Sequence, residues 1–131
     1  MAGNAVREPD VMFMDLTETD RDAIKRVIVA QIEAFQADDG IQAFLYAAPS
    51  IRQQFKSVGN FMRMVRSAYP AICQPHGVLF DGLNEMHGFP AQTVLLMGRN
   101  SEIVKAIYLM QRQSQRDWCI AGCFLVPLGE D

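Results

Sequence analysis

The feature that most constrains the fold of this chain is a regular apolar stripe in residues 20–37. Its members are spaced three or four residues apart along one face: Ile24, Val27, Ile28, Ile32 and Phe35. A helix has about 3.6 residues per turn, so these side chains share one side of it. The stripe predicts a long amphipathic helix that must cover another part of the molecule. Residues 17–20 offer several N-cap candidates, and among them Asp20 has a side-chain oxygen that can accept a backbone N–H from the first turn.

Helical patterns continue to residue 69 and are separated by capping residues and prolines. Asp39 is expected to cap a second helix that ends before Pro49, because the residue preceding a proline disfavours the α conformation. Ser50 is expected to begin a single turn, and Ser57 a further full helix that Pro70 stops. The first half of the chain therefore predicts three helical segments in a compact layer.

The second half of the chain changes to short extended segments at residues 77–85, 92–98, 102–113 and 117–128. Short polar connections join them, so neighbouring strands should be antiparallel. Helices first and strands second is an α+β pattern, with three N-terminal helical segments packed on a four-stranded antiparallel sheet. We expect one domain over residues 17–128. Residues 1–16 are expected to form a tail, or an edge strand at 11–16.

The two final strands are apolar on both faces. In the last strand, strict alternation would place Trp118, Ile120, Phe124 and Val126 on one face and Cys119, Ala121, Cys123 and Leu125 on the other. An antiparallel sheet with one face in water would alternate apolar and polar residues. We therefore expect helices to cover one face and a second copy of the chain to cover the other, as a homodimer. A sheet that curls around its own core is the alternative.

Composition limits the classes of function. The chain has 131 residues and a net charge of −3, and half of its residues are hydrophobic. Its basic residues are scattered, which argues against nucleic-acid binding. No run of about 18 apolar residues or secretory leader pattern is present, so no membrane association is expected. Of the three cysteines, Cys119 and Cys123 would lie about 13 Å apart on one strand, too far to pair. These features predict a cytoplasmic protein.

Four separated segments carry a family resemblance: AFQADDG, AFLYAAPSIRQQF, NFMRMVRSAYP and WCIAGCFLVP. In this order they resemble a bacterial family, domain-of-unknown-function family 4864, within the nuclear-transport-factor-2-like (cystatin-like) superfamily. The resemblance covers roughly residues 20–127. It implies a cone in which a strongly curved antiparallel sheet wraps around the long helix, often enclosing a hydrophobic cavity. It also implies pairing of two copies through their sheets.

The enzymes of that superfamily resemble ketosteroid isomerase and scytalone dehydratase, so the resemblance directs attention to acids, tyrosines and histidines. Isomerase chemistry needs a carboxylate base in an apolar pocket and a donor aimed at the developing oxyanion. Asp81 with Tyr69 or Tyr108 is the one such combination that can be assembled, and it makes Asp81 a weak catalytic candidate. Dehydratase chemistry would have to use His76 and His87, which is a weaker hypothesis.

Metal and cofactor sites are not expected. Cys73 and His76 are three residues apart, but a structural zinc ion needs four ligands, usually in paired clusters. No glycine-rich run opens a helix after a strand, so the sequence predicts no nucleotide site.

The leading hypothesis is a non-catalytic binding or scaffolding protein that forms a homodimer and holds a small apolar ligand. The expected cavity-lining residues are aromatic: Phe35, Tyr46, Phe55, Phe61, Tyr69, Phe80, Tyr108 and Trp118. A small isomerase- or dehydratase-like enzyme that acts on an apolar substrate, with Asp81 as base, is the first alternative. A protein-assembly factor that uses the sheet face, with a cavity filled by its own side chains, is the second.

Overall fold

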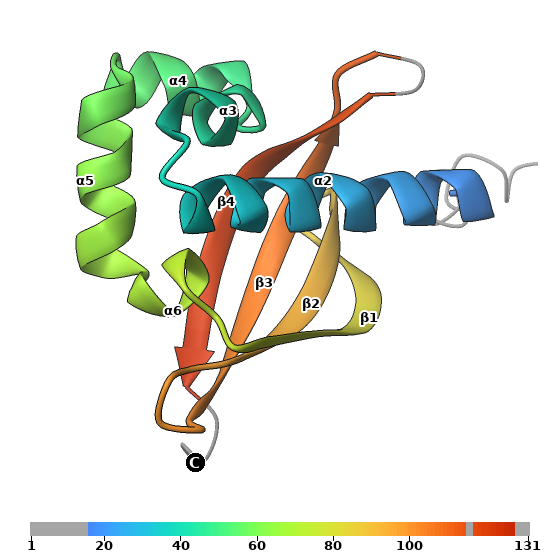
Figure 1. The fold of residues 1–131 in the computed structure, drawn as a ribbon. Coiled ribbons are helices and arrows are strands. Elements are labelled where there is room, and N and C mark those ends of the chain that lie inside the picture. Colours follow the sequence, from blue (N-terminus) through green and yellow to red (C-terminus); the bar gives the residue numbers. More distant parts are fainter. Residues whose placement is uncertain (1–15, 115–116, 128–131) are drawn as a thin grey trace, which may run out of the picture.

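The computed structural model describes residues 16–114 and 117–127, and it has the expected α+β architecture (Figure 1). The helices are α2 (Glu18–Gln36), α3 (Gly40–Leu45), α4 (Pro49–Phe55), α5 (Val58–Ala68) and α6 (Pro70–Cys73). The strands are β1 (Gly77–Met86), β2 (Phe89–Met97), β3 (Ile103–Arg112) and β4 (Trp118–Pro127). All the helices precede all the strands, which confirms the predicted fold class. The predicted tail or edge strand lies outside the described residues except for Leu16, which is buried.

Capping residues explain where the main helices begin. The Thr17 hydroxyl accepts the Asp20 backbone N–H at 3.0 Å, and the Asp20 carboxylate accepts the Thr17 N–H at 3.0 Å. This reciprocal capping box makes Thr17, one of the several candidates in residues 17–20, the N-cap of α2, and Asp20 lies in the first turn of the helix. The predicted caps Asp39 and Ser57 are confirmed, since their side chains accept N–H groups in the first turns of α3 and α5.

Pro49 and Pro70 each follow the end of one helix, as predicted, and each also begins the next helix, so the described part of the chain has five helices where three segments were predicted. Pro49 is the first residue of α4, whose N-cap is Ala48 and not the predicted Ser50. Pro70 likewise begins the short helix α6. A proline at the first helical position loses nothing by lacking an N–H, because that N–H has no partner within the helix.

The sheet is an antiparallel meander in the order β1-β2-β3-β4, with a bulge in each edge strand. In β1 the register shifts between Phe80 and Gly82. In β4, Gly122 pairs with Leu109 and Ile120 pairs with Met110, which leaves Ala121 as an extra residue. A bulge residue changes which face the following side chains occupy.

The bulge corrects the predicted alternation in β4. Cys123 and Leu125 lie opposite Tyr108 and Ala106, which are both buried in the helix-facing core. Trp118 and Ile120 are also buried on that side. Phe124 and Val126 therefore belong to the face turned away from the helices, and the predicted grouping of these four residues on one face was wrong.

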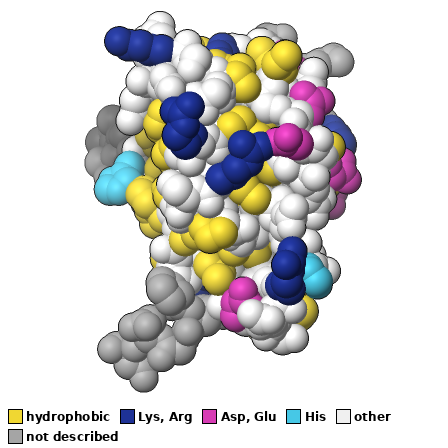
Figure 2. All heavy atoms as spheres, turned by 60° about the vertical axis from the view of Figure 1, so that its left-hand side comes forward, with side chains coloured by type: hydrophobic (Ala, Val, Ile, Leu, Met, Phe, Trp, Pro, Cys, Tyr) yellow, Lys and Arg dark blue, Asp and Glu magenta, His cyan; other side chains and the backbone are white. Residues whose placement is uncertain are grey.

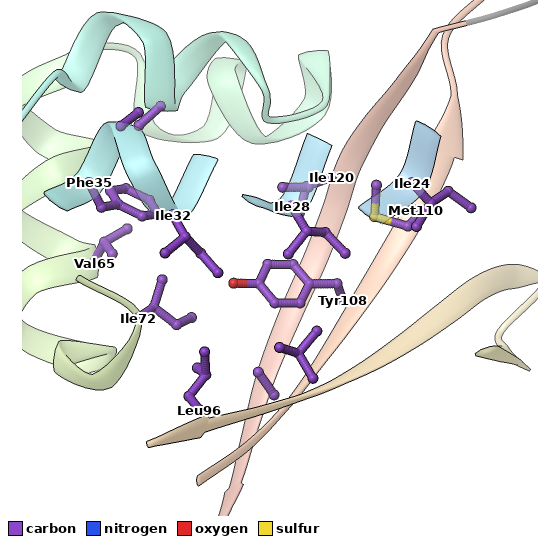
Figure 3. Close-up of a cluster of buried hydrophobic side chains, with 14 of the residues drawn as sticks. Ile24, Ile28, Ile32, Phe35, Val65, Ile72, Leu96, Tyr108, Met110 and Ile120 are labelled. Carbon is purple, nitrogen blue, oxygen red and sulfur yellow. The ribbon is translucent and has the colours of Figure 1, made fainter. Parts of the chain in front are cut away.

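The core lies between α2 and the sheet. Ile24, Ile28 and Ile32 of α2 are buried against Tyr108 and other residues of β2 and β3 (Figure 3). At one end of α2 the ring of Phe61 contacts three phenylalanines, with centroid distances of 5.2 to 6.1 Å: Phe35, Phe44 and Phe55. These contacts hold α5 beside the sheet and not directly over it, as Figure 1 shows.

The face of the sheet turned away from α2, here called the outer face, is largely apolar. The register and the pleat place on it Leu79, Leu95, Met97, Ile103, Ile107, Phe124 and Val126. Five of these are exposed large hydrophobics, from Val126 at 38% to Leu79 at 63%. Lys105 points to the same face. The expectation that both faces of the last strands are apolar therefore agrees with the register. Within the described residues, no helix is long and apolar enough to cross a membrane.

Candidate ligand pocket

A pocket of about 400 Å³ lies between α4, α5 and the edge strand β4, and residues of α2 and β3 form its inner wall. None of the described residues that line it carries a charge. The polar side chains among them are Gln31, Gln54, Tyr69, Tyr108 and Cys123, and the rest are aliphatic, aromatic, methionine or glycine. Gln54 and Phe124 are exposed and therefore mark the mouth of the pocket. Gln31 and Tyr108 are buried and therefore mark its inner wall.

Backbone pairing with the outer edge of β4 ends just before the part of the strand that borders the pocket. The segment between α3 and α4 pairs with β4 at one residue, where the Ala48 N–H donates to the Ile120 carbonyl and the Ile120 N–H to the Tyr46 carbonyl, both at 2.8 Å. Arg52 strengthens this segment by donating to the Ala47 carbonyl at 2.7 Å. The bulge at Ala121 follows immediately, and from there the edge of β4 borders the pocket.

Figure 2 turns the α5 side of the molecule forward, and apolar side chains are exposed across the middle of that face. Lysine and arginine side chains lie around them and do not form one basic surface. The charge distribution on this face therefore agrees with the uncharged lining of the pocket.

Two tyrosines of the pocket differ in their hydrogen bonding. The Tyr69 hydroxyl donates to the Cys123 carbonyl at 3.3 Å. The Tyr108 side chain is 1% exposed, and its hydroxyl has no hydrogen-bond partner in the described part of the chain. Figure 3 shows this hydroxyl pointing away from β3, toward the side on which Val65 and Ile72 lie, and both of those residues line the pocket.

Burial keeps the titratable groups of the pocket protonated. It raises the pKa of Tyr108 well above its ordinary value of 10.0, and the nearby Cys123 thiol adds to the effect. Burial likewise raises the pKa of Tyr69, and it raises that of Cys123 to about 12. Near pH 7 the pocket therefore contains neutral phenols, a neutral thiol and amides.

Gln31 is the polar lining residue of α2. It is 4% exposed, and its Nε2 donates to the Ala43 carbonyl at 3.0 Å. Sequence reasoning missed it, because the search was for aromatic lining residues. The signal was present: Gln31 lies between Ile28 and Ile32 near the buried stripe of α2, where a polar residue needs a partner.

The structure brings together five of the eight predicted lining residues around this pocket: Phe35, Phe55, Phe61, Tyr69 and Tyr108. The other three lie elsewhere. Tyr46 is half-buried in the segment that pairs with Ile120, and Phe80 is half-buried in β1 below the Lys25 ammonium. Trp118 is buried below the Arg112 guanidinium, 4.4 Å from its ring centre.

The weak catalytic candidate Asp81 does not join the two pocket tyrosines. It lies at the bulge of β1, where it is exposed to solvent, and it is not among the lining residues. A general base has to lie within hydrogen-bond reach of the substrate, and Asp81 lies outside the pocket that would hold it.

No group of three or more His, Cys, Asp or Glu side chains converges as a metal site within residues 16–114 and 117–127. Cys73 is half-buried and His76 is exposed. All three cysteines are free thiols.

These features define an α+β protein with a helical layer on one face of an open antiparallel sheet, consistent with a cone-like nuclear-transport-factor-2 fold, and with an uncharged pocket at the sheet edge. The chain belongs to the family described as Domain of unknown function (DUF4864), whose family model matches residues 17–130. No curated protein and no solved structure matches the chain.

Proposed function

We propose that this protein binds a small apolar molecule, without transforming it, in the pocket beside β4. The observation that carries the proposal is the uncharged, largely apolar lining of a cavity of about 400 Å³. Small-molecule sites typically occupy about 300–1,000 Å³ and combine an apolar lining with a few polar groups that orient the ligand. The two tyrosines and Gln31 would supply those polar groups here.

The lining residues favour binding over catalysis. Proton abstraction near pH 7 requires a group whose pKa lies near that pH. The pocket offers phenols with raised pKa values, amides, and a thiol with a pKa of about 12, and among residues 16–114 and 117–127 no carboxylate or imidazole lines it. The isomerase-like alternative therefore lacks its base at this site.

Native mass spectrometry of the freshly purified protein, followed by denaturation of the same sample, tests the proposal. We expect additional mass on the folded protein that is released on unfolding. Ala121→Phe should reduce this mass, because Ala121 lines the pocket and the added ring would occupy it. Ala68→Phe is the matched control, since Ala68 is exposed at the end of α5 and does not line the pocket. Passenger mass that is retained equally in both variants would contradict the proposed site.

A second proposal concerns the outer face, and it is carried by the exposed Leu79, Met97, Ile103, Phe124 and Val126. We propose that two copies of the chain pack through this face as a homodimer. A continuous apolar patch on a small protein marks an interaction surface, and self-association through one patch on each copy is the commonest solution. The assembly-factor alternative would use the same face for a different protein.

Light scattering coupled to size-exclusion chromatography tests the homodimer. The wild type should elute as a dimer, and Ile103→Glu should be a monomer, because a carboxylate would lose its hydration on entering a largely apolar interface. Ile41→Glu is the control, since Ile41 is 66% exposed on α3, away from the sheet. A monomeric wild type at all accessible concentrations would overturn the homodimer and favour the assembly-factor alternative.

The three free thiols support a further proposal, that the protein works in a reducing compartment such as the cytoplasm. Fractionation of cells that produce the tagged protein would test it, and recovery outside the cytoplasmic fraction would refute it.

A further inference from the structure

The Tyr108 hydroxyl is an exception to the hydrogen bonding of this protein. Buried polar groups almost always have a partner, and an unsatisfied hydroxyl in an apolar environment costs on the order of 1–3 kcal/mol. In the described residues, two buried side-chain polar atoms lack one: the Tyr108 hydroxyl and Trp118 Nε1. Only Tyr108 of these two residues lines the pocket.

The other polar side chains on the inner side of the pocket already have partners. One N–H of the Gln31 amide donates to the Ala43 carbonyl, and the half-buried Tyr69 hydroxyl donates to the Cys123 carbonyl. Gln54, the remaining amide, is exposed at the mouth. Among the described lining side chains, the Tyr108 hydroxyl is thus the buried polar group that has no hydrogen-bond partner at all. Its O–H remains intact near pH 7, because the pKa of Tyr108 is raised.

We infer that the pocket selects a neutral, mainly apolar molecule that carries a hydrogen-bond acceptor such as a carbonyl oxygen, which the Tyr108 hydroxyl binds. This inference rests on the proposed binding function and specifies its ligand class. An ionised ligand would lose its hydration in a pocket whose described lining residues carry no charge to compensate for it. A purely apolar ligand would leave the Tyr108 hydroxyl without a partner.

Three probes that share a two-ring frame separate these requirements. Diphenylmethane has no acceptor, benzophenone adds one carbonyl, and 4-benzoylbenzoate adds a carboxylate to benzophenone. Equilibrium dialysis with absorbance detection gives the affinity of each probe for the full-length wild type, for Tyr108→Phe and for Tyr46→Phe. Tyr46→Phe is the matched control, because Tyr46 does not line the pocket.

The informative quantity is the change, from wild type to variant, in the ratio of the benzophenone affinity to the diphenylmethane affinity. The difference in hydrophobicity between the two probes is the same for every variant, so it cancels in this comparison. We expect this ratio to fall about 3- to 10-fold in Tyr108→Phe, as for the loss of one hydrogen bond, and to stay unchanged in Tyr46→Phe. We also expect 4-benzoylbenzoate to bind the wild type at least about tenfold more weakly than benzophenone.

Each contrary result has a distinct meaning. If both neutral probes bind and the ratio is the same in wild type and Tyr108→Phe, the role of Tyr108 is overturned while the binding function stands. Tight binding of 4-benzoylbenzoate would overturn the requirement for a neutral ligand. If neither neutral probe binds the wild type, both this inference and the proposed binding function are wrong.

Discussion

Replacing Tyr108 with phenylalanine should stabilise the ligand-free protein, although the substitution removes a polar group from the centre of the molecule. The side chain is 1% exposed and its hydroxyl has no partner in the described residues, so the folded state loses the hydration of that hydroxyl without compensation. Phenylalanine retains the ring and its contacts with the core. The unfolded chain solvates either residue well.

The magnitude follows from two opposing contributions. Removing an unsatisfied buried hydroxyl recovers about 1–3 kcal/mol. The missing oxygen leaves a small void, and at about 24 cal/mol per Å³ a void of roughly 10–15 Å³ costs about 0.3 kcal/mol. We therefore expect the free energy of unfolding to rise by about 0.7–2.7 kcal/mol. For a domain of this size, such a change raises Tm by several degrees.

Urea denaturation followed by tryptophan fluorescence measures the change, since Trp118, the one tryptophan of the chain, is buried. Tyr69→Phe is the matched comparison in the same pocket. It removes a hydroxyl that donates to the Cys123 carbonyl, so it should lower the free energy of unfolding by about 0.5–1.5 kcal/mol. The two variants make the same chemical change and should have opposite signs.

Destabilisation of Tyr108→Phe by more than about 1 kcal/mol would refute this reasoning, because it would mean that the hydroxyl forms a bond worth that much in the folded protein. Stabilisation together with the loss of carbonyl selectivity would show that the protein retains an unfavourable group for binding. Such trade-offs between stability and function are common at ligand sites.

Three further predictions concern the rest of the molecule. Asp20→Asn should lower the free energy of unfolding by about 1 kcal/mol near neutral pH. Hydrogen bonds from the Thr17 backbone N–H and from Arg112 lower the Asp20 pKa below 3.8. Urea denaturation at several pH values should therefore show the stability difference between wild type and variant vanishing as the pH falls below 3.8. Gly40→Ala should destabilise by about 1–2 kcal/mol in thermal melts, because its Cβ would lie 2.9 Å from Met62 Cγ; an unchanged Tm would contradict this packing. The Cys123 pKa is raised from an ordinary 9.0 to about 12, so iodoacetamide should label this thiol about 1,000-fold more slowly than an ordinary cysteine. For the same reason, the contribution of Cys123 to stability should fade as the pH rises from 9.0 toward 12. Peptide mass spectrometry measures the labelling, and fast labelling near pH 8 would show that the thiol is accessible and has an ordinary pKa.

Local sequence signals were sufficient for the α+β class, the antiparallel order of strands and several helix boundaries. Asp39 and Ser57 cap α3 and α5 as expected, because an N-cap depends on atoms within one turn of the capping residue. The ends of α3 before Pro49 and of α5 before Pro70 were also predicted, but not that each proline begins the next helix, since a proline is compatible both with the residues after a helix and with its first position. Local sequence does not decide between these two.

The amino-acid sequence by itself determined which segments are helical or extended and that the last two strands are apolar on both faces, because these properties follow from periodicities of 3.6 and 2 residues. The tertiary structure alone decided the bulge at Ala121, the pocket beside β4 and the isolation of the Tyr108 hydroxyl. The physical reason is that each of these depends on what lies across space from a residue. The Tyr69 and Tyr108 side chains are chemically identical, and only the position of the Cys123 carbonyl gives one of them a partner and leaves the other without one.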